Sequence, residues 1–158
     1  MSTIKVDLMK YQGYEAAGIA DDLSTFEFLS VGKSGRFLKL IIFRPMEYDN
    51  LYYLAFGDID ENGLLDDGVI TDNGDRNKIL ATVASAVERY TSRYPERMIY
   101  FRGSTKARTR LYRMAISLNL EELSLTYEIY AHIDSQDQFP IFQKNMELNA
   151  FLVKGKAL

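Results

Sequence analysis

Two patterns of hydrophobic and polar residues divide the chain, one with a period of two and one with a helical period. Alternation over residues 25–31 (TFEFLSV) and 36–43 (RFLKLIIF) predicts two strands, and the turn residues at 32–35 between them predict a hairpin. The aromatic run at 51–57 (LYYLAFG) predicts a third strand. Residues 58–74 are rich in Asp, Asn and Gly and are expected to form a loop.

Helical spacing follows Asp75. Apolar side chains recur at intervals of three and four residues, namely at Ile79, Leu80, Val83, Val87, Tyr90 and Tyr94. This spacing predicts an amphipathic helix over residues 76–93. We expect Asp75 to be its N-cap and to accept backbone N–H bonds. Pro95 ends the helix.

The second half of the chain predicts a strand, a helix and two more strands. The apolar run 98–101 (MIYF) is the first strand, and Ser104 or Thr105 would cap a helix that runs to about residue 118. Residues 125–133 and 150–153 predict the last two strands. The order β-β-β-α-β-α-β-β predicts an α+β fold, with two main helices on a mostly antiparallel sheet. We predict one domain over residues 1–158, because no linker or repeat divides the chain.

Composition removes several classes of function. The chain has no cysteine, which excludes disulfides, thiolate nucleophiles and thiolate metal sites. His132 is the single histidine, so two histidines cannot share a metal, and its strand-like surroundings favour a structural role. The net charge of −3 means that any affinity for nucleic acid has to be local. We expect a cytoplasmic protein without membrane contact, because no run of about 18 apolar residues and no signal-like segment occurs.

Residues 58–66 (DIDENGLLD) are similar to the opening of a calcium-binding EF-hand loop. Oxygen ligands would stand at its first, third and fifth positions, with glycine at the sixth. The twelfth position should carry a bidentate Glu and is Val69, and the preceding run is strand-like where the motif needs a helix. We therefore expect a solvated acidic turn rather than a metal site.

A cationic stretch at 102–114 (RGSTKARTRLYRM) contrasts with the acidic chain. On a helix from Thr105, one side would be apolar and face the core, with Ala107, Leu111, Met114, Ala115 and Leu118. Another stripe would carry Lys106, Arg110 and Arg113, and Arg108 would lie one turn from Tyr112. Cations in the first turns of a helix oppose its dipole, and a bound anion would compensate for this. A network of internal ion pairs would do the same, so both interpretations stay open.

The candidate anion site joins the N-termini of the two predicted helices. Its residues are Gly74, Arg76, Lys78, Arg102, Gly103, Ser104, Thr105, Arg108 and Arg110. The small residues at 103–105 would let backbone N–H groups approach the anion closely. The alternative is an interaction protein whose basic helix face, with Lys106, Arg110 and Arg113, binds nucleic acid or an acidic protein.

Five segments carry a resemblance to a known family: 26–43 (FEFLSVGKSGRFLKLIIF), 53–58 (YLAFGD), 72–90 (DNGDRNKILATVASAVERY), 102–116 (RGSTKARTRLYRMAI) and 149–156 (NAFLVKGK). On these segments the chain resembles a bacterial family catalogued only as a domain of unknown function. The resemblance implies a cytoplasmic single-domain protein. It brings no activity with it.

The predicted order of elements is also similar to the GNAT acetyltransferases, after the first two helices of that fold. This resemblance implies that residues 73–81 (NGDRNKILA) receive a cofactor pyrophosphate at a helix N-terminus. Residues 104–112 (STKARTRLY) are similar to the family's N-x-x-A-x-x-L-Y pattern, which implies that Tyr112 protonates a leaving thiolate. The chain departs from the family at Ser104, where the family has Asn, and at Asp75, whose carboxylate would repel phosphate.

The leading expectation is a domain that binds an anionic or phosphorylated small molecule between the two helix N-termini. Acyl transfer is the chemistry that the acetyltransferase resemblance implies. Neither a cofactor nor a general base follows from the sequence, so whether the domain is an enzyme stays open at this point.

Overall fold

A computed structural model describes residues 12–66 and 73–156 and has the predicted α+β architecture, with one mostly antiparallel sheet. The strands are β1 (Gly18–Ile19), β2 (Thr25–Gly32), β3 (Gly35–Pro45), β4 (Leu51–Ile59), β5 (Leu65–Asp66), β6 (Met98–Phe101), β7 (Tyr127–His132) and β8 (Ala150–Gly155). The helices are α2 (Arg76–Arg93), α3 (Lys106–Leu118) and α4 (Leu120–Thr126). The strand order is β1-β2-β3-β4-β6-β8-β7, and β5 pairs with β4.

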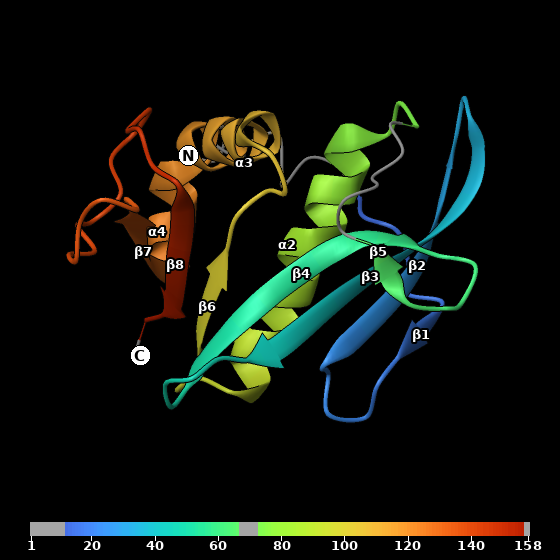
Figure 1. Cartoon of the computed structure of the whole chain (residues 1–158), viewed down its shortest axis with the longest axis horizontal. Helices are drawn as coiled ribbons and strands as arrows, with labels where there is room; N and C mark the ends of the chain where they lie inside the picture. The colour runs from blue at the N-terminus through green and yellow to red at the C-terminus, as the bar shows by residue number, and fades with distance from the viewer. Residues whose placement is uncertain (1–11, 67–72, 157–158) are drawn as a thin grey trace.

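The pairing of β4 with β6 is parallel, whereas the other pairings among the described strands are antiparallel. It begins with Leu51 opposite Met98 and ends with Tyr53 opposite Tyr100. β4 continues beyond this point, and the two strands separate toward the end of the sheet where α3 begins (Figure 1). The sheet therefore has a gap in its backbone hydrogen bonding where β4 and β6 diverge. We call this gap the angle between β4 and β6.

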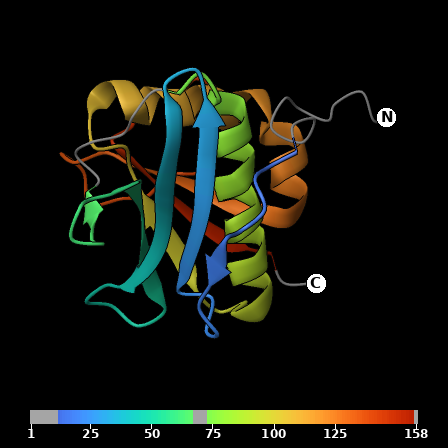
Figure 2. The same ribbon diagram turned by 90° about the vertical axis from the view of Figure 1, so that its right-hand side faces the viewer.

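α2 lies along one face of the sheet (Figure 1, Figure 2). The larger hydrophobic core forms there, from Phe26, Phe28, Ile41, Phe43, Leu54, Phe56, Ala86, Tyr90 and Ile99. The rings of Phe43 and Tyr90 stack with centroids 4.0 Å apart. Burying each large apolar side chain contributes about 1.5 to 3 kcal/mol, which anchors α2 to the sheet. Five of the six residues predicted for the packing face of this helix contact or join this core, namely Ile79, Val83, Val87, Tyr90 and Tyr94, whereas Leu80 does not.

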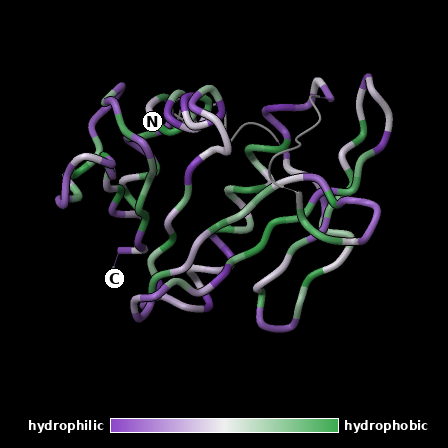
Figure 3. The backbone as a smooth tube through the Cα atoms, in the orientation of Figure 1, coloured by the Kyte–Doolittle hydropathy of each residue, from purple (hydrophilic) through white to green (hydrophobic). Residues whose placement is uncertain are grey.

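A second core lies under α3 and α4. It consists of Tyr127, Ile129, Ala131, Phe142, Phe151 and Val153. Val87 and Phe101 contact both cores, so the two are continuous across the angle in the sheet. Hydrophobic residues follow the strands and the inner side of α2, and hydrophilic residues gather in the connecting loops (Figure 3).

The apolar stripe predicted for the second helix is wrong. Met114 is 54% exposed and Leu118 is 53% exposed, whereas Thr109 and Ser117 are buried. The side of α3 that packs on the second core carries Tyr112 and also Ile116. The helix is therefore rotated about its axis relative to the prediction.

Local hydrogen bonds explain this rotation. Thr109 Oγ1 accepts a bond from the backbone N–H of Gly103 at 3.0 Å. Ser117 Oγ accepts one from the backbone N–H of Asn145, also at 3.0 Å. Small polar side chains can be buried without penalty when their hydrogen bonds are made, and these two tie α3 to its neighbouring loops.

Three short elements, β1, β5 and α4, were not predicted from the sequence. Residues 58–74 were expected to be loop, but the short strand β5 pairs there with β4. The strand expected from residue 125 begins at Tyr127, because α4 occupies the residues before it. Glu121 and Glu122 in the first turn of α4 suit the positive end of a helix dipole. The short edge strand β1 had no sequence signal.

The carboxylates at the acidic turn after β4 interact with other groups of the protein. Asp58 forms an ion pair with Lys39, whose side chain is completely buried. Asp60 Oδ1 accepts the backbone N–H bonds of Asn62 and Leu64, at 2.8 and 2.9 Å. No cluster of potential metal ligands occurs among the residues that the structure describes, while Val69 at the twelfth loop position lies outside them. Asp58 and Asp60 thus fix this turn by contacts within the protein.

Candidate functional site

Two adjoining cavities lie between α2 and α3, at the angle between β4 and β6. The larger has a volume of about 340 Å³ and the smaller about 230 Å³. Leu80, Val83 and Tyr112 line both, so the two adjoin at these residues, and we call them together the interhelical cavity. Its size falls in the range of about 300 to 1,000 Å³ that is common for small-molecule sites.

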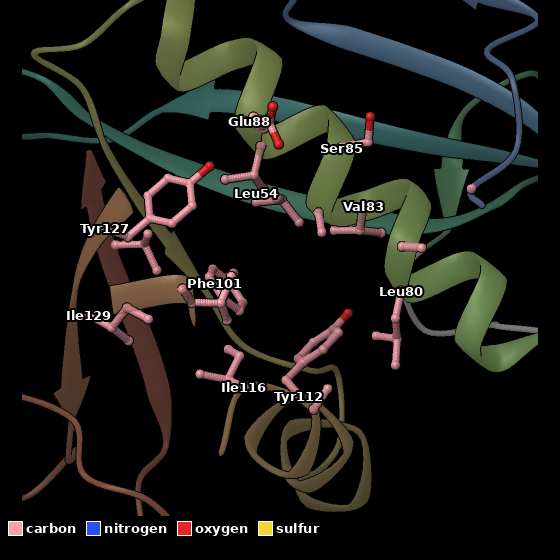
Figure 4. A pocket seen from close by; sticks show the side chains of 17 residues that line it. Leu54, Leu80, Val83, Ser85, Glu88, Phe101, Tyr112, Ile116, Tyr127 and Ile129 are labelled. Atoms are coloured by element: carbon pink, nitrogen blue, oxygen red, sulfur yellow. The ribbon is translucent and has the colours of Figure 1, made fainter. Parts of the chain in front are cut away.

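The larger part of the interhelical cavity is apolar. Leu54 of β4, Phe101 of β6, Ile116 of α3 and Ile129 of β7 form its walls (Figure 4). Glu88 of α2 stands at its edge, next to the ring of Tyr127 (Figure 4). Such walls suit a hydrocarbon chain or an aromatic ring, because they offer it apolar contact in place of water.

Tyr112 stands where the two parts meet. Its ring rises from α3 and its hydroxyl points toward α2 (Figure 4). The hydroxyl forms no hydrogen bond with the residues that the structure describes. Burial raises the pKa of Tyr112 to about 12. At neutral pH the phenol is therefore protonated and able to donate a hydrogen bond into the cavity.

This raised pKa predicts a loss of stability at high pH. Up to pH 10 the phenol stays protonated in the folded and the unfolded protein, whereas between pH 10 and 12 only the unfolded protein releases the proton. Tyr112 should therefore lower the free energy of unfolding by up to about 2 to 3 kcal/mol as the pH rises through this window. Urea unfolding of wild type and Tyr112→Phe at pH 9, where both states keep the proton, and at pH 12, at the upper end of the window, measures this loss. Equal losses in the two proteins would contradict the assignment.

The smaller part of the cavity is polar on one side. Arg108 reaches it from α3, one turn before Tyr112, and also donates a hydrogen bond to Ser104 Oγ. Arg76 reaches it from the first turn of α2 and forms no ion pair with any described residue. The first turn of α2 contains no acidic residue. Two arginines, the carboxylate of Asp75 and the positive end of a helix dipole thus line this end of the cavity.

Asp75 stands at the N-cap position of α2, but the prediction that its side chain caps the helix is wrong. The carboxylate makes no bond to the backbone N–H groups of the first turn. Its Oδ2 accepts bonds from the hydroxyls of Tyr14 and Ser30 instead, the latter at 2.6 Å. These hydroxyls hold the carboxylate away from the helix axis. The N–H groups at the start of α2 consequently receive no acceptor from Asp75.

The other oxygen of Asp75, Oδ1, is buried and has no hydrogen-bond partner among the described residues. An unpaired buried carboxylate oxygen costs stability, and native proteins keep few of them. Asp75 lines the polar part of the interhelical cavity. The free oxygen can accept a hydrogen bond from a donor group in the cavity.

The backbone before α2 is fixed by Asn73 and Gly74. Asn73 is buried and bridges the β2–β3 hairpin, accepting from Ser34 N at 2.7 Å and donating to Gly35 O at 2.9 Å. Gly74 has φ +76°, a conformation that glycine adopts without strain. Lys78 lies over the ring of Tyr14, 4.3 Å from its centroid, and does not line the cavity.

The N-terminus of α3 lines a different concavity. Arg102, Gly103, Ser104 and Thr105 border a polar groove of about 750 Å³, together with Arg110. Thr105 caps α3 by accepting the backbone N–H of Arg108 at 3.2 Å, as the sequence predicts. The two helix N-termini therefore do not share one cavity. Of the nine candidate ligand-binding residues, Arg76 and Arg108 line the interhelical cavity.

A family profile matches residues 10–156, essentially the whole chain. The chain belongs to the DUF6934 family. It is described as a family of unknown function, in agreement with the resemblance found in the sequence. No curated protein and no solved structure matches the chain, so the similarity to acetyltransferases has no support beyond the order of elements.

None of the helices described in this DUF6934 protein is long and apolar enough to cross a membrane. The sequence had paired Arg108 with Tyr112, and both side chains do line the same cavity. It gave no hint that Leu80 borders both parts of that cavity or that Asp75 faces its polar end. Those positions depend on how α2 packs against the sheet, which no local pattern encodes.

Proposed function

We propose that this DUF6934 protein binds an amphipathic small molecule, with an apolar chain and a phosphate or carboxylate head, in the interhelical cavity. The observation that carries the proposal is the position of Tyr112. Its free hydroxyl marks the boundary between an apolar space and a space that Arg76 and Arg108 line. A molecule that fills both parts satisfies the apolar walls, the phenol and the cations together.

The cations support an anionic head. Hydrogen bonds from guanidinium groups to carboxylate or phosphate oxygens are about twice as strong as neutral ones. The N–H groups at the start of α2 add donors, since Asp75 does not cap them. This keeps an anion site at the start of α2, with Arg108 supplied by the facing helix. The carboxylate of Asp75 lines the same end and repels negative charge, so the head has to lie on the side of the two arginines.

The apolar part supports a chain rather than an isolated ion. Burying one methylene group contributes about 0.8 kcal/mol, which corresponds to roughly a fourfold gain in affinity. An inorganic anion would leave these walls unused. The head and chain together favour an alkyl phosphate, a fatty acid or a related acyl compound.

Acyl transfer by Tyr112 is a weaker proposal than binding. A general acid works best when its pKa lies near the operating pH, whereas burial raises that of Tyr112 to about 12. A leaving thiolate with an ordinary pKa of about 8.5 would not take a proton from such a phenol readily. We therefore assign to Tyr112 a hydrogen bond to the ligand, and no proton transfer.

Calorimetric titration with octyl phosphate, butyl phosphate and inorganic phosphate tests this proposal. Wild type should bind octyl phosphate about 100-fold more tightly than butyl phosphate, because four more methylene groups are buried. Arg108→Glu should weaken octyl phosphate binding by about 10- to 100-fold, since a charge-assisted bond is lost. Arg36→Glu, the same charge reversal on the exposed β2–β3 hairpin, is the matched control and should bind normally. Equal affinity for all three phosphates would contradict the proposal.

A further inference from the structure

The cationic stretch of α3 serves a second concavity besides the interhelical cavity. Four cationic side chains and two carboxylates line the polar groove of about 750 Å³, namely Arg102, Lys106, Arg110, Arg113, Asp134 and Glu147. We call it the α3 groove. It lies on the side of α3 that faces the loops after β7, and Arg108 and Tyr112 do not line it.

Two of the cations are held in place. Arg102 donates to Tyr100 Oη at 2.6 Å and pairs with Asp134 at 3.0 Å. Tyr100 Oη also lies 2.7 Å from His132 Nδ1, so the single histidine supports this arrangement from behind. Arg113 pairs with Glu147 at 2.9 Å. Arg102 and Arg113 are thereby oriented before any ligand arrives, which lowers the entropic cost of binding.

The acidic partners leave the groove accessible. The side chains of Asp134 and Glu147 are 54% and 91% exposed. Ion pairs with such exposed carboxylates are weak, so a stronger anion can replace or share them. Lys106 and Arg110 form no ion pair with the part of the chain that the structure describes. Two oriented cations and two unpaired ones thus point to a ligand with several negative charges.

We propose that the α3 groove binds a compact polyphosphate group, such as that of a nucleoside triphosphate. Its four cations and two carboxylates give the groove a charge of +2, so the rest of a chain with net charge −3 carries −5. A long nucleic acid would extend over this acidic remainder and be repelled. A compact polyanion stays inside the groove, where the field is positive. This site is independent of the interhelical cavity and rests on different residues.

Calorimetric titration with inorganic tripolyphosphate tests this second site. Wild type should bind tripolyphosphate, and Lys106→Glu and Arg110→Glu should each weaken binding by about tenfold or more. Affinity should fall steeply as the salt concentration rises, because the contacts are charge pairs. Arg36→Glu again supplies the matched charge reversal and should leave binding unchanged. Circular dichroism and melting curves check that each variant is folded, and Arg110→Gln repeats the test without adding an acid.

Three results would overturn this inference. One is a wild-type protein that does not bind tripolyphosphate at millimolar concentration. Another is a loss of binding in Arg108→Glu with none in Arg110→Glu, which would place the polyphosphate in the interhelical cavity. The third is a single-stranded oligothymidine that binds more tightly than tripolyphosphate through Lys106 and Arg110, which would make the groove a nucleic-acid site.

Discussion

The Asp58→Ala variant should lose about 3 to 5 kcal/mol of unfolding free energy, the typical cost of breaking a buried ion pair from one side. Lys39 is completely buried on the core face of β3, and Asp58 on the adjacent strand pairs with its ammonium group. Removing the carboxylate takes a charged partner from a buried ammonium group that lies 5.8 Å from the ring centroid of Phe37, and burying a charge without full compensation is costly. Urea unfolding of wild type and variant measures the difference.

Two further variants make this result specific. Glu61→Ala removes an exposed carboxylate from the same turn and should change stability by less than about 0.5 kcal/mol. The double variant Lys39→Met with Asp58→Leu removes both charges and should recover most of the loss, because apolar replacement of a buried pair is often neutral. A loss below about 1 kcal/mol in Asp58→Ala would mean that the pair does not hold β3 to β4.

The Leu80→Trp variant should abolish binding of octyl phosphate while keeping the protein folded. Leu80 borders both parts of the interhelical cavity, so an indole ring there would occupy the space that joins them. Filling a cavity with apolar atoms does not require the core to expand, and it commonly adds about 0.5 to 2 kcal/mol of stability. Calorimetric titration measures the affinity for octyl phosphate, and a melting curve of the same sample measures the stability.

The exposed apolar residue Leu38 provides the control for this experiment. It lies on β3 and is not among the cavity residues. Leu38→Trp adds the same ring and should bind octyl phosphate as wild type does. If Leu80→Trp retains full affinity with normal folding, the ligand does not occupy the junction of the two parts, and the proposed function is wrong.

The longer strands and α2 were predictable because their periods are strong. The alternation in residues 36–43 even puts Lys39 on the same face as Ile41 and Phe43, where the structure has it. Its partner Asp58 could not be predicted, because only the register between β3 and β4 brings the two together. A sequence pattern can place a charged residue on the buried face of a strand. It does not show which residue on another strand carries the opposite charge.

α3 shows why spacing alone can mislead. Met114 and Leu118 have the apolar spacing of a buried stripe, yet they are exposed. Thr109 and Ser117 are buried because partners outside the helix satisfy their hydroxyls. A pattern of hydrophobicity contains no information about such partners, so it gave the wrong rotation of the helix.

The sequence identifies the cationic residues of the candidate sites but not how the fold groups them. Cations at the start of a helix suggested an anion, and the spacing of Arg108 and Tyr112 put them on one side of α3. The sequence placed one anion between two helix N-termini, whereas the cations divide between the interhelical cavity and the α3 groove. Which cations line which site depends on how α2 and α3 pack on the separated strands β4 and β6. That packing cannot be inferred from local sequence patterns.

The central claim is that an amphipathic anion occupies the interhelical cavity, and methyl NMR spectra recorded during addition of octyl phosphate test it most directly. The methyl resonances of Leu80, Val83 and Ile116 should shift together and saturate at one concentration, since all three line the cavity. Those of the exposed Leu38 should not move. Shifts confined to surface methyl groups, with Leu80, Val83 and Ile116 unchanged at saturating octyl phosphate, would contradict the claim.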